Sequence, residues 1–198
     1  MLKEFCLIST FSVPPTLAKP LKDVSIFCGK PLRLEIVVQG IPLPTVSWYK
    51  DENLLTGPDS IIESKDKSHS LSLKESNTNH NGIYKAFVEN SAGFVESICN
   101  VEIQTKPQIV PPSDVKITAG EDFNIAVIID GKPKPKIKWL KDKKEIPSNL
   151  GLIAGEDGNS FSLNLKESTT LLNGSYSITA TNPAGTDSAS FKVVVSGM

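Results

Sequence analysis

The sequence contains few of the residues from which most catalytic and metal centres are built, with two histidines and three cysteines among 198 residues. No Cys-x-x-Cys pair occurs, and His69 and His80 lack the spacing of zinc ligands. The sequence also lacks a glycine-rich phosphate loop, a nucleophile elbow and a His-Glu-x-x-His motif. We therefore expect no enzymatic activity, no metal site, no cofactor and no small-molecule substrate.

A charge imbalance and long apolar runs are absent too. The net charge is −1, which argues against a general nucleic-acid binder or a polybasic membrane-surface protein. No apolar run approaches the roughly 18 residues that span a bilayer, so no transmembrane segment is expected. The short apolar run Phe5–Val13 is interrupted by Ser9, Thr10 and Ser12 and has no clear cleavage site. We interpret residues 1–13 as an unordered leader rather than as a secretory signal.

A long internal repeat is what the sequence does contain. Three stretches recur in the same order: Gly29–Asp51 as Gly120–Asp142, Leu71–Ser76 as Leu163–Ser168, and Asn81–Tyr84 as Asn173–Tyr176. Solenoid repeats run to only about 20–50 residues, whereas the period here is close to half of the chain. We therefore expect two domains of one kind, residues 14–105 and residues 106–198.

The pattern within each copy predicts β-strands. LRLEIVV and FNIAVII are rich in branched residues, and in TVSWYK and KIKWLK polar and apolar side chains alternate. Turn residues separate such runs roughly every 8–12 residues, and no helical periodicity of useful length appears. This pattern favours an all-β fold of two tandem sandwiches of antiparallel sheets, arranged end to end.

Three prolines mark the boundary between the copies. Pro107, Pro111 and Pro112 are expected to stiffen the start of the second copy and to block edge pairing there. Because almost no free linker remains, we expect the pair to behave as a semi-rigid rod.

Both copies resemble intermediate-set immunoglobulin domains. The resemblance is carried by Gly-x-Pro-x-Pro runs that lead to a tryptophan, Leu-x-Leu-Lys-Glu-Ser strands, Gly-x-Tyr corners and Asn-x-Ala-Gly hairpins. It implies that Trp48 and Trp139 occupy the sandwich centres, and that Tyr84 and Tyr176 close the corners through their hydroxyl groups.

Two pairs of positions carry further implications of the resemblance. Gly93 and Gly185 would supply the left-handed position of a hairpin. His80 and Leu172 stand where the family usually has an acidic residue. The cap or salt bridge that the acidic residue makes is therefore in question in both copies.

The positions of the family's inter-sheet disulfide carry apolar residues here. By the resemblance these positions are Ile36 and Ala86 in the first copy, and Val127 and Ile178 in the second. A native bridge in a small secreted domain is worth about 2–5 kcal/mol, and it does not form in the reducing cytosol. The loss of both bridges predicts a cytoplasmic protein.

The remaining cysteines are Cys6, Cys28 and Cys99. Cys99 falls in step with Val101 and Ile103 on the inward face of the last strand of its copy, where a free cysteine behaves as a small buried apolar residue. A redox-labile bridge between Cys28 and Cys99 is the alternative, and it depends on a distance that sequence does not give.

One basic stripe is a candidate partner-binding face. Lys134, Lys136 and Lys138 alternate with Pro135 and Ile137, so on a strand they would share its outer side. They could meet an acidic filament surface or anionic lipid. We favour the other interpretation, a solvated edge whose lysines prevent strand-to-strand aggregation.

The resemblance extends to the tandem immunoglobulin segments of giant intracellular muscle proteins such as titin, twitchin, kettin and obscurin. It implies a structural spacer and docking rod in the sarcomere, with partners among myosin or actin filaments or other sarcomeric modules. A kinase domain elsewhere in a longer parent chain is compatible with this.

Two other functions stay open. One is an extracellular adhesion or receptor fragment of the immunoglobulin superfamily. The other is an actin-binding scaffold of the palladin and myotilin type, in which a basic immunoglobulin face binds the filament.

Overall fold

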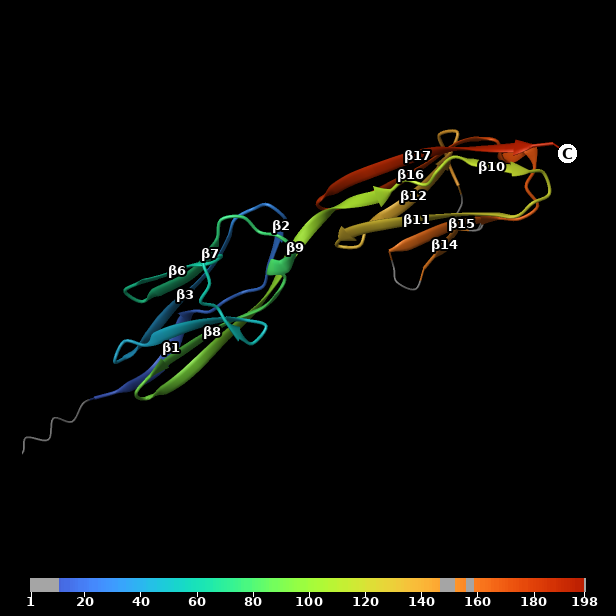
Figure 1. Cartoon of the computed structure of the whole chain (residues 1–198). Coiled ribbons are helices and arrows are strands. Elements are labelled where there is room, and N and C mark those ends of the chain that lie inside the picture. The colour runs from blue at the N-terminus through green and yellow to red at the C-terminus, as the bar shows by residue number, and fades with distance from the viewer. Residues whose placement is uncertain (1–10, 147–151, 156–158, 198) are drawn as a thin grey trace, which may run out of the picture. The chain divides into compact units, whose positions relative to one another are not determined.

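The chain divides into two compact units, Met1–Ile103 and Gln104–Met198. The structure, a computed structural model, describes residues 11–146, 152–155 and 159–197 (Figure 1). Most of the predicted leader lies outside the described residues, and Val13, its last residue, already begins the first strand. Each unit is a sandwich of two β-sheets, which confirms the predicted all-β fold with tandem immunoglobulin-like domains.

In unit 1 one sheet has the strand order β1-β3-β7-β6 and is antiparallel. Its strands are β1 (Val13–Lys19), β3 (Leu32–Ile41), β7 (Ser68–Leu73) and β6 (Ile61–Lys65). The other sheet has the order β9-β8-β4-β5, with β2 also paired to β9. Its strands are β2 (Val24–Phe27), β9 (Gly93–Val110), β8 (Gly82–Asn90), β4 (Thr45–Lys50) and β5 (Asn53–Leu54). Unit 1 includes β9 up to Ile103.

Unit 2 repeats this arrangement. One sheet joins the last residues of β9 to β11 (Phe123–Lys132), β15 (Ser160–Leu165) and β14 (Leu152–Ala154). The other has the order β10-β17-β16-β12-β13. Its strands are β10 (Val115–Thr118), β17 (Gly185–Ser196), β16 (Gly174–Asn182), β12 (Lys136–Lys141) and β13 (Lys144–Glu145). At the start of unit 2 the chain first pairs with β11 in one sheet. It then crosses to the other sheet, where the short β10 pairs with β17 in the parallel direction.

The prediction that the boundary prolines block edge pairing is wrong at Pro107. Gln108–Val110 pair with β11 in unit 2. Pro107 itself falls at an irregularity in the register, opposite Gly131. A sheet tolerates a missing N–H at such a bulge, so the proline is accommodated within the strand. Pro111 and Pro112 follow the last paired residue and end the strand.

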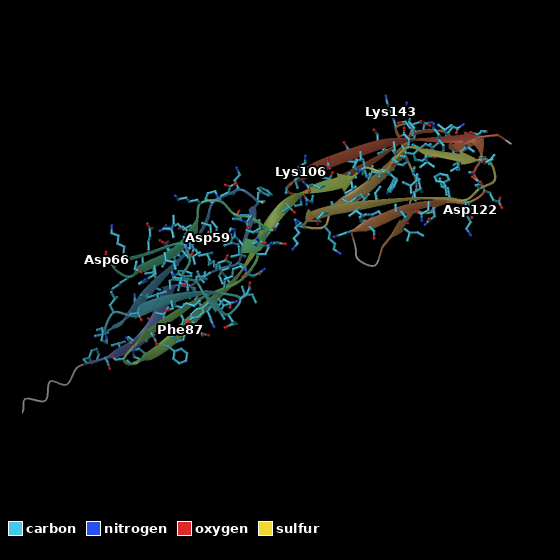
Figure 2. The ribbon with its side chains drawn as sticks, viewed as in Figure 1. Asp59, Asp66, Phe87, Lys106, Asp122 and Lys143 are labelled. Atoms are coloured by element: carbon cyan, nitrogen blue, oxygen red, sulfur yellow. The ribbon has the colours of Figure 1, made fainter. Side chains whose placement is uncertain are left out.

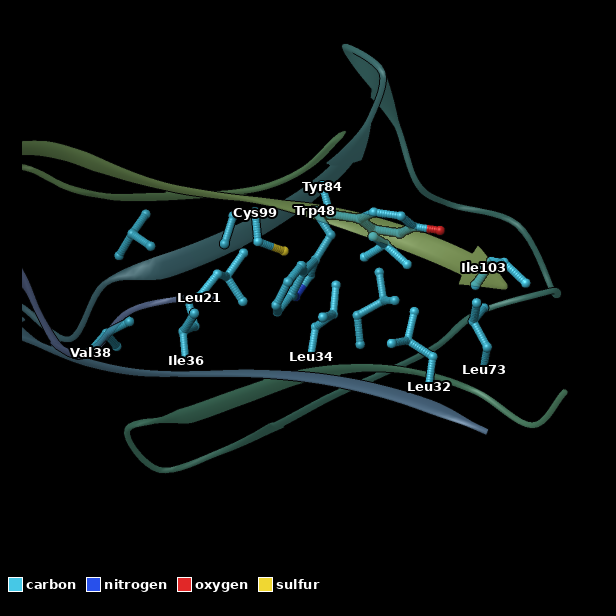
Figure 3. Close-up of a cluster of buried hydrophobic side chains, with 14 residues drawn as sticks. Leu21, Leu32, Leu34, Ile36, Val38, Trp48, Leu73, Tyr84, Cys99 and Ile103 are labelled. Carbon is cyan, nitrogen blue, oxygen red and sulfur yellow. The ribbon is translucent and has the colours of Figure 1, made fainter. Parts of the chain in front are cut away.

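The two tryptophans and the two corner tyrosines lie in the cores, where none is more than 4% exposed. The four positions that would carry the family's disulfides are buried as well. In register, Ala86 pairs with Trp48 and Ile178 pairs with Trp139. Figure 3 shows the unit 1 core, in which side chains from both sheets meet around Trp48. Burying a large aliphatic side chain stabilises a fold by about 1.5–3 kcal/mol, so hydrocarbon holds the sheets together.

The cores differ where the last strand faces the tryptophan. Unit 1 has Cys99 there, buried and free, and burial raises the pKa of its thiol to about 11. Cys28 is exposed and also free, and its Sγ lies 3.6 Å from the Ser76 carbonyl oxygen. Unit 2 has Phe191, which stacks on Tyr176 with ring centres 5.5 Å apart. An aromatic ring thus fills space in one core where a thiol stands in the other.

The corners are built alike but capped differently. The Tyr84 hydroxyl donates to the His80 carbonyl oxygen at 3.2 Å, and the Tyr176 hydroxyl donates to the Leu172 carbonyl oxygen at 3.0 Å. In the 3-10 helix η1 (Thr78–His80), the Nδ1 atom of His80 accepts from the backbone N–H of Asn77 at 2.9 Å. In η2 (Thr170–Leu172) no side-chain cap is present. Histidine therefore provides in unit 1 the cap that the family's acidic residue provides, and unit 2 lacks it.

A glycine precedes each corner because an aspartate lies against it. The Asp51 carboxylate accepts from the backbone N–H of Ile83 at 2.9 Å, and Asp142 does the same for Ser175. A Cβ atom on Gly82 would lie 2.5 Å from the Asp51 carboxylate, and φ there is +144°. The Gly-x-Tyr motif thus leaves room for this carboxylate beside the backbone.

The Asn-x-Ala-Gly motifs join three segments of each sandwich. In unit 2 the Asn182 side-chain amide donates to the carbonyl oxygens of Thr105 and Pro133, both at 2.8 Å. Its Oδ1 accepts from the backbone N–H of Ala184 at 2.9 Å. Asn90 makes the equivalent bonds in unit 1. The glycines that end the motifs, Gly93 and Gly185, have φ of +152° and +149°.

A buried histidine distinguishes unit 1 from unit 2. His69 lies on the inner side of β7, opposite Ile36, and is 6% exposed. Its Nδ1 atom is 2.9 Å from the Ser64 Oγ atom, and among the described residues its Nε2 atom has no hydrogen-bond partner. Burial lowers the pKa of His69 below its ordinary value of 6.5. The repeat places Phe161 at the equivalent position in unit 2.

Replacing Asn182 by alanine should destabilise unit 2 by about 1–3 kcal/mol, because two carbonyl groups and one N–H lose their partner. Chemical denaturation of the whole chain, followed unit by unit through native-state hydrogen exchange, measures the loss. Asn164→Ala is the control, since its amide makes one 3.3 Å bond to Ser162, and it should change stability by no more than about 0.5 kcal/mol. Equal losses for the two variants would contradict the bridging role of Asn182.

Lowering the pH should destabilise unit 1 through His69. The unfolded chain takes up a proton near pH 6.5, whereas the folded unit does so only at a lower pH. The unfolded state therefore binds more protons between these two values, and stability falls as the pH drops through this window. His69→Phe, which introduces the residue of unit 2, should reduce the loss between pH 7.5 and 5.5.

Hydrogen exchange at the two pH values reads the units separately, and the response of unit 2 should not change in the His69→Phe variant. The same pH dependence of unit 1 with either residue would mean that the burial of His69 does not control it.

Candidate protein-interaction surfaces

No chemical centre emerges in the described part of the chain. Among residues 11–146, 152–155 and 159–197, no cluster of three or more histidines, cysteines or acidic residues could hold a metal ion. The described residues also contain no helix with the length and apolarity to cross a membrane. The candidate interaction surfaces therefore lie on the outer faces of the sheets.

The three lysines of the predicted basic face are all exposed, but they do not share one strand. Lys136 and Lys138 lie on the outer side of β12 and alternate with the inward-facing Ile137 and Trp139. Lys134 precedes the strand, in the connection from β11. The ammonium group of Lys138 lies 3.7 Å from the Glu145 carboxylate. An ion pair this exposed contributes little to the stability of the fold.

The pairing of β12 bears on the role of these lysines. One side of the strand pairs with β16 along its whole length. The other side pairs with β13 at Leu140 and Lys141 alone among the described residues. Lys136 and Lys138 therefore lie beside backbone that could pair with another strand, where lysine disfavours aggregation.

A second surface lies on unit 1, and reasoning from the sequence missed it. We call it the β8–β9 face: outward-facing side chains of β8 and β9 with their neighbours on β4 and β5, namely Ile83, Phe87, Phe94, Ile98, Tyr49 and Leu54. Phe94 is 67% exposed, and Ile83, Ile98 and Leu54 are each more than half exposed. The rings of Phe87 and Phe94 stack with centres 5.3 Å apart, and Figure 2 shows Phe87 on the surface of unit 1.

One ammonium group lies within the β8–β9 face. The Nζ atom of Lys85 is 2.8 Å from Glu52 and 3.7 Å from Glu96, and it lies 5.2 Å from the centre of the Tyr49 ring. The hydrogen bond to Glu52 raises the pKa of Lys85. Glu89 is exposed beside Phe94 in the register. Glu96 lies within the face, opposite Phe87 and between Phe94 and Ile98 on β9, whereas Glu89 and Glu52 lie at its edges. Among the outward-facing residues of β8 and of β9 as far as Ile103, Lys85 carries the one positive charge.

Unit 2 has a different surface at the equivalent positions. The repeat matches Ile83, Phe87, Phe94 and Ile98 with Ser175, Thr179, Thr186 and Ser190. It also matches the β4 residues Thr45 and Ser47 with Lys136 and Lys138. This contrast was visible in the sequence. The run IYKAFV has two large apolar residues, Ile83 and Phe87, on the side opposite Tyr84, Ala86 and Val88, whereas SYSITA has only hydroxyl-bearing residues on the corresponding side.

The comparisons with known proteins agree with the fold of both units. The family model for the immunoglobulin I-set domain matches residues 15–103 and 107–195. The chain is 31% identical to the muscle M-line assembly protein unc-89 of Caenorhabditis elegans, over 89% of this chain and 2% of that protein. It is 30% identical to hemicentin-1 of Homo sapiens, over 92% of this chain and 3% of that protein.

The chain thus spans only a small part of the length of these relatives. Among solved structures, a titin A168169 structure superimposes with a TM-score of 0.72 and 22% identity, over 92% of this chain and 99% of that chain. A complex of Dpr11 IG1 with DIP-gamma gives a TM-score of 0.76 and 18% identity, over 91% of this chain and 98% of that chain. At such identities the likeness shows the fold alone. With two complete I-set matches on two sandwiches, the chain belongs to the immunoglobulin I-set family.

Proposed function

We propose that the chain is a structural and scaffolding segment of an intracellular giant muscle protein, in which it acts as a spacer and as a docking site for other proteins. The observation that carries the proposal is the composition of the two cores. At each pair of disulfide positions both sandwiches bury hydrocarbon, at Ile36 and Ala86 and at Val127 and Ile178. A domain selected for an oxidising compartment gains stability from the bridge, and these domains are closed without it.

The similarity to unc-89 and to the titin homolog of C. elegans supports the sarcomeric location. The similarity to hemicentins supports the alternative, an extracellular adhesion module. We favour the intracellular proposal because a disulfide-free core agrees with a reducing compartment.

The location can be tested by staining muscle of the source organism with an antibody raised against the folded chain. We expect a striated pattern that appears only after the cells are permeabilised. Staining of intact, non-permeabilised cells or of the surrounding matrix would overturn the intracellular assignment. A second antibody against a cytosolic sarcomeric protein controls for permeabilisation.

An actin-binding role is a second candidate, favoured by the exposed lysines on and before β12. If that face binds the acidic surface of an actin filament, co-sedimentation should fall steeply between 50 and 200 mM salt, because such contacts are screened. Lys136→Glu/Lys138→Glu should then lower binding at least about tenfold, which corresponds to about 1.4 kcal/mol.

The matched control is Lys65→Glu/Lys67→Glu, which makes the same change of charge at exposed lysines in unit 1. No co-sedimentation of the native chain at low salt would remove the actin-binding candidate and would leave the spacer proposal unaffected.

A further inference from the structure

We propose that the β8–β9 face of unit 1 docks a protein surface that presents aromatic or branched apolar side chains flanked by lysine or arginine. The proposal deepens the docking role proposed above and rests on it. It names the face of this chain that binds and the chemistry of the partner.

The exposed apolar residues of the β8–β9 face lie close together on adjacent strands. Single exposed apolar side chains are ordinary on a protein surface, but here they are neighbours. Phe87 and Phe94 stack on each other, and Ile98 and Tyr49 flank Lys85 on the strands to either side. Contiguous apolar patches rimmed by polar groups mark interaction sites, and aromatic residues are enriched in the centre of interfaces.

The internal repeat provides a control within the same chain. Thr179 and Thr186 occupy the positions of Phe87 and Phe94 in a sheet with the same strand order. The immunoglobulin fold therefore does not require aromatic residues there. Their presence in unit 1 needs a reason other than folding, and contact with a partner supplies one.

The charge on the β8–β9 face selects the partner. Glu89 lies opposite Phe94, Glu96 lies opposite Phe87, and Glu52 bonds to Lys85. These three carboxylates outnumber the Lys85 ammonium group on the outward side of β8 and β9. Two copies of the chain that met through this face would bring their carboxylates together, which disfavours a symmetric dimer. A partner with lysine or arginine around an apolar centre satisfies both the apolar and the charged parts of the face.

The test uses the whole chain and three synthetic seven-residue peptides. The first alternates lysine with phenylalanine or isoleucine. The second keeps the lysines and has serine at the apolar positions, and the third keeps the apolar residues and has glutamate for lysine. NMR titration follows the methyl and aromatic signals of Ile83, Phe87, Phe94 and Ile98. We expect the first peptide to shift these signals at concentrations at least about tenfold lower than the other two peptides need.

Phe87→Thr/Phe94→Thr, which introduces the residues of unit 2, should abolish the shifts of the remaining signals. Ile98→Ser is a second, milder variant that should weaken binding if the double variant does not fold. The matched control is Leu171→Asn, which removes an equally apolar side chain that is 83% exposed in unit 2. It should leave binding unchanged.

Three outcomes would overturn the proposal. They are no shift on the β8–β9 face with any peptide, shifts that persist in Phe87→Thr/Phe94→Thr, and concentration-dependent shifts without peptide. The last would show that a second copy occupies the face. None of these outcomes bears on the muscle location, which the antibody staining tests separately.

Discussion

Contact between the inner faces of two sheets is the interaction on which each unit depends. In immunoglobulin domains that carry the inter-sheet disulfide, a covalent bond also joins the sheets at this point. Here Trp48 and Trp139 pack among aliphatic side chains, and the bridge positions add to that packing. Because dispersion and apolar burial are not directional, the two cores can meet the same requirement differently. Unit 1 combines Ala86 with Cys99, whereas unit 2 combines Ile178 with Phe191.

The hydrogen bonds outside the cores are much less variable. The aspartate under the corner glycine, the asparagine amide between two carbonyl groups and the tyrosine hydroxyl recur in both units with nearly the same lengths. Each of these groups bonds to backbone atoms at turns and strand ends, and backbone polar groups left without a partner are costly. This explains why short polar motifs survive in both copies while many of the apolar residues between them have changed.

The sequence was sufficient to predict the fold class, the family and the burial side of most strands. These features follow from the alternation of side chains and from motifs that recur twice. It failed at Pro107, where a general rule about proline did not anticipate a bulge opposite Gly131. It also directed attention to Lys134, Lys136 and Lys138, because a run of equal charges is conspicuous in one dimension. Ile83 and Phe87 were a signal within one strand, but the full β8–β9 face escaped notice because only the register of two strands brings Phe87 beside Phe94.

The uneven distribution of cysteine gives the chain a built-in reporter. All three cysteines belong to the first 103 residues, and Gln104–Met198 contains none. Cys28 is accessible to a thiol reagent in the native state, whereas Cys99 becomes accessible only when the sheets around it separate. Labelling of Cys99, identified by its own peptide, therefore reports openings of the first sandwich alone on a pulled or heated chain, with no engineered residue.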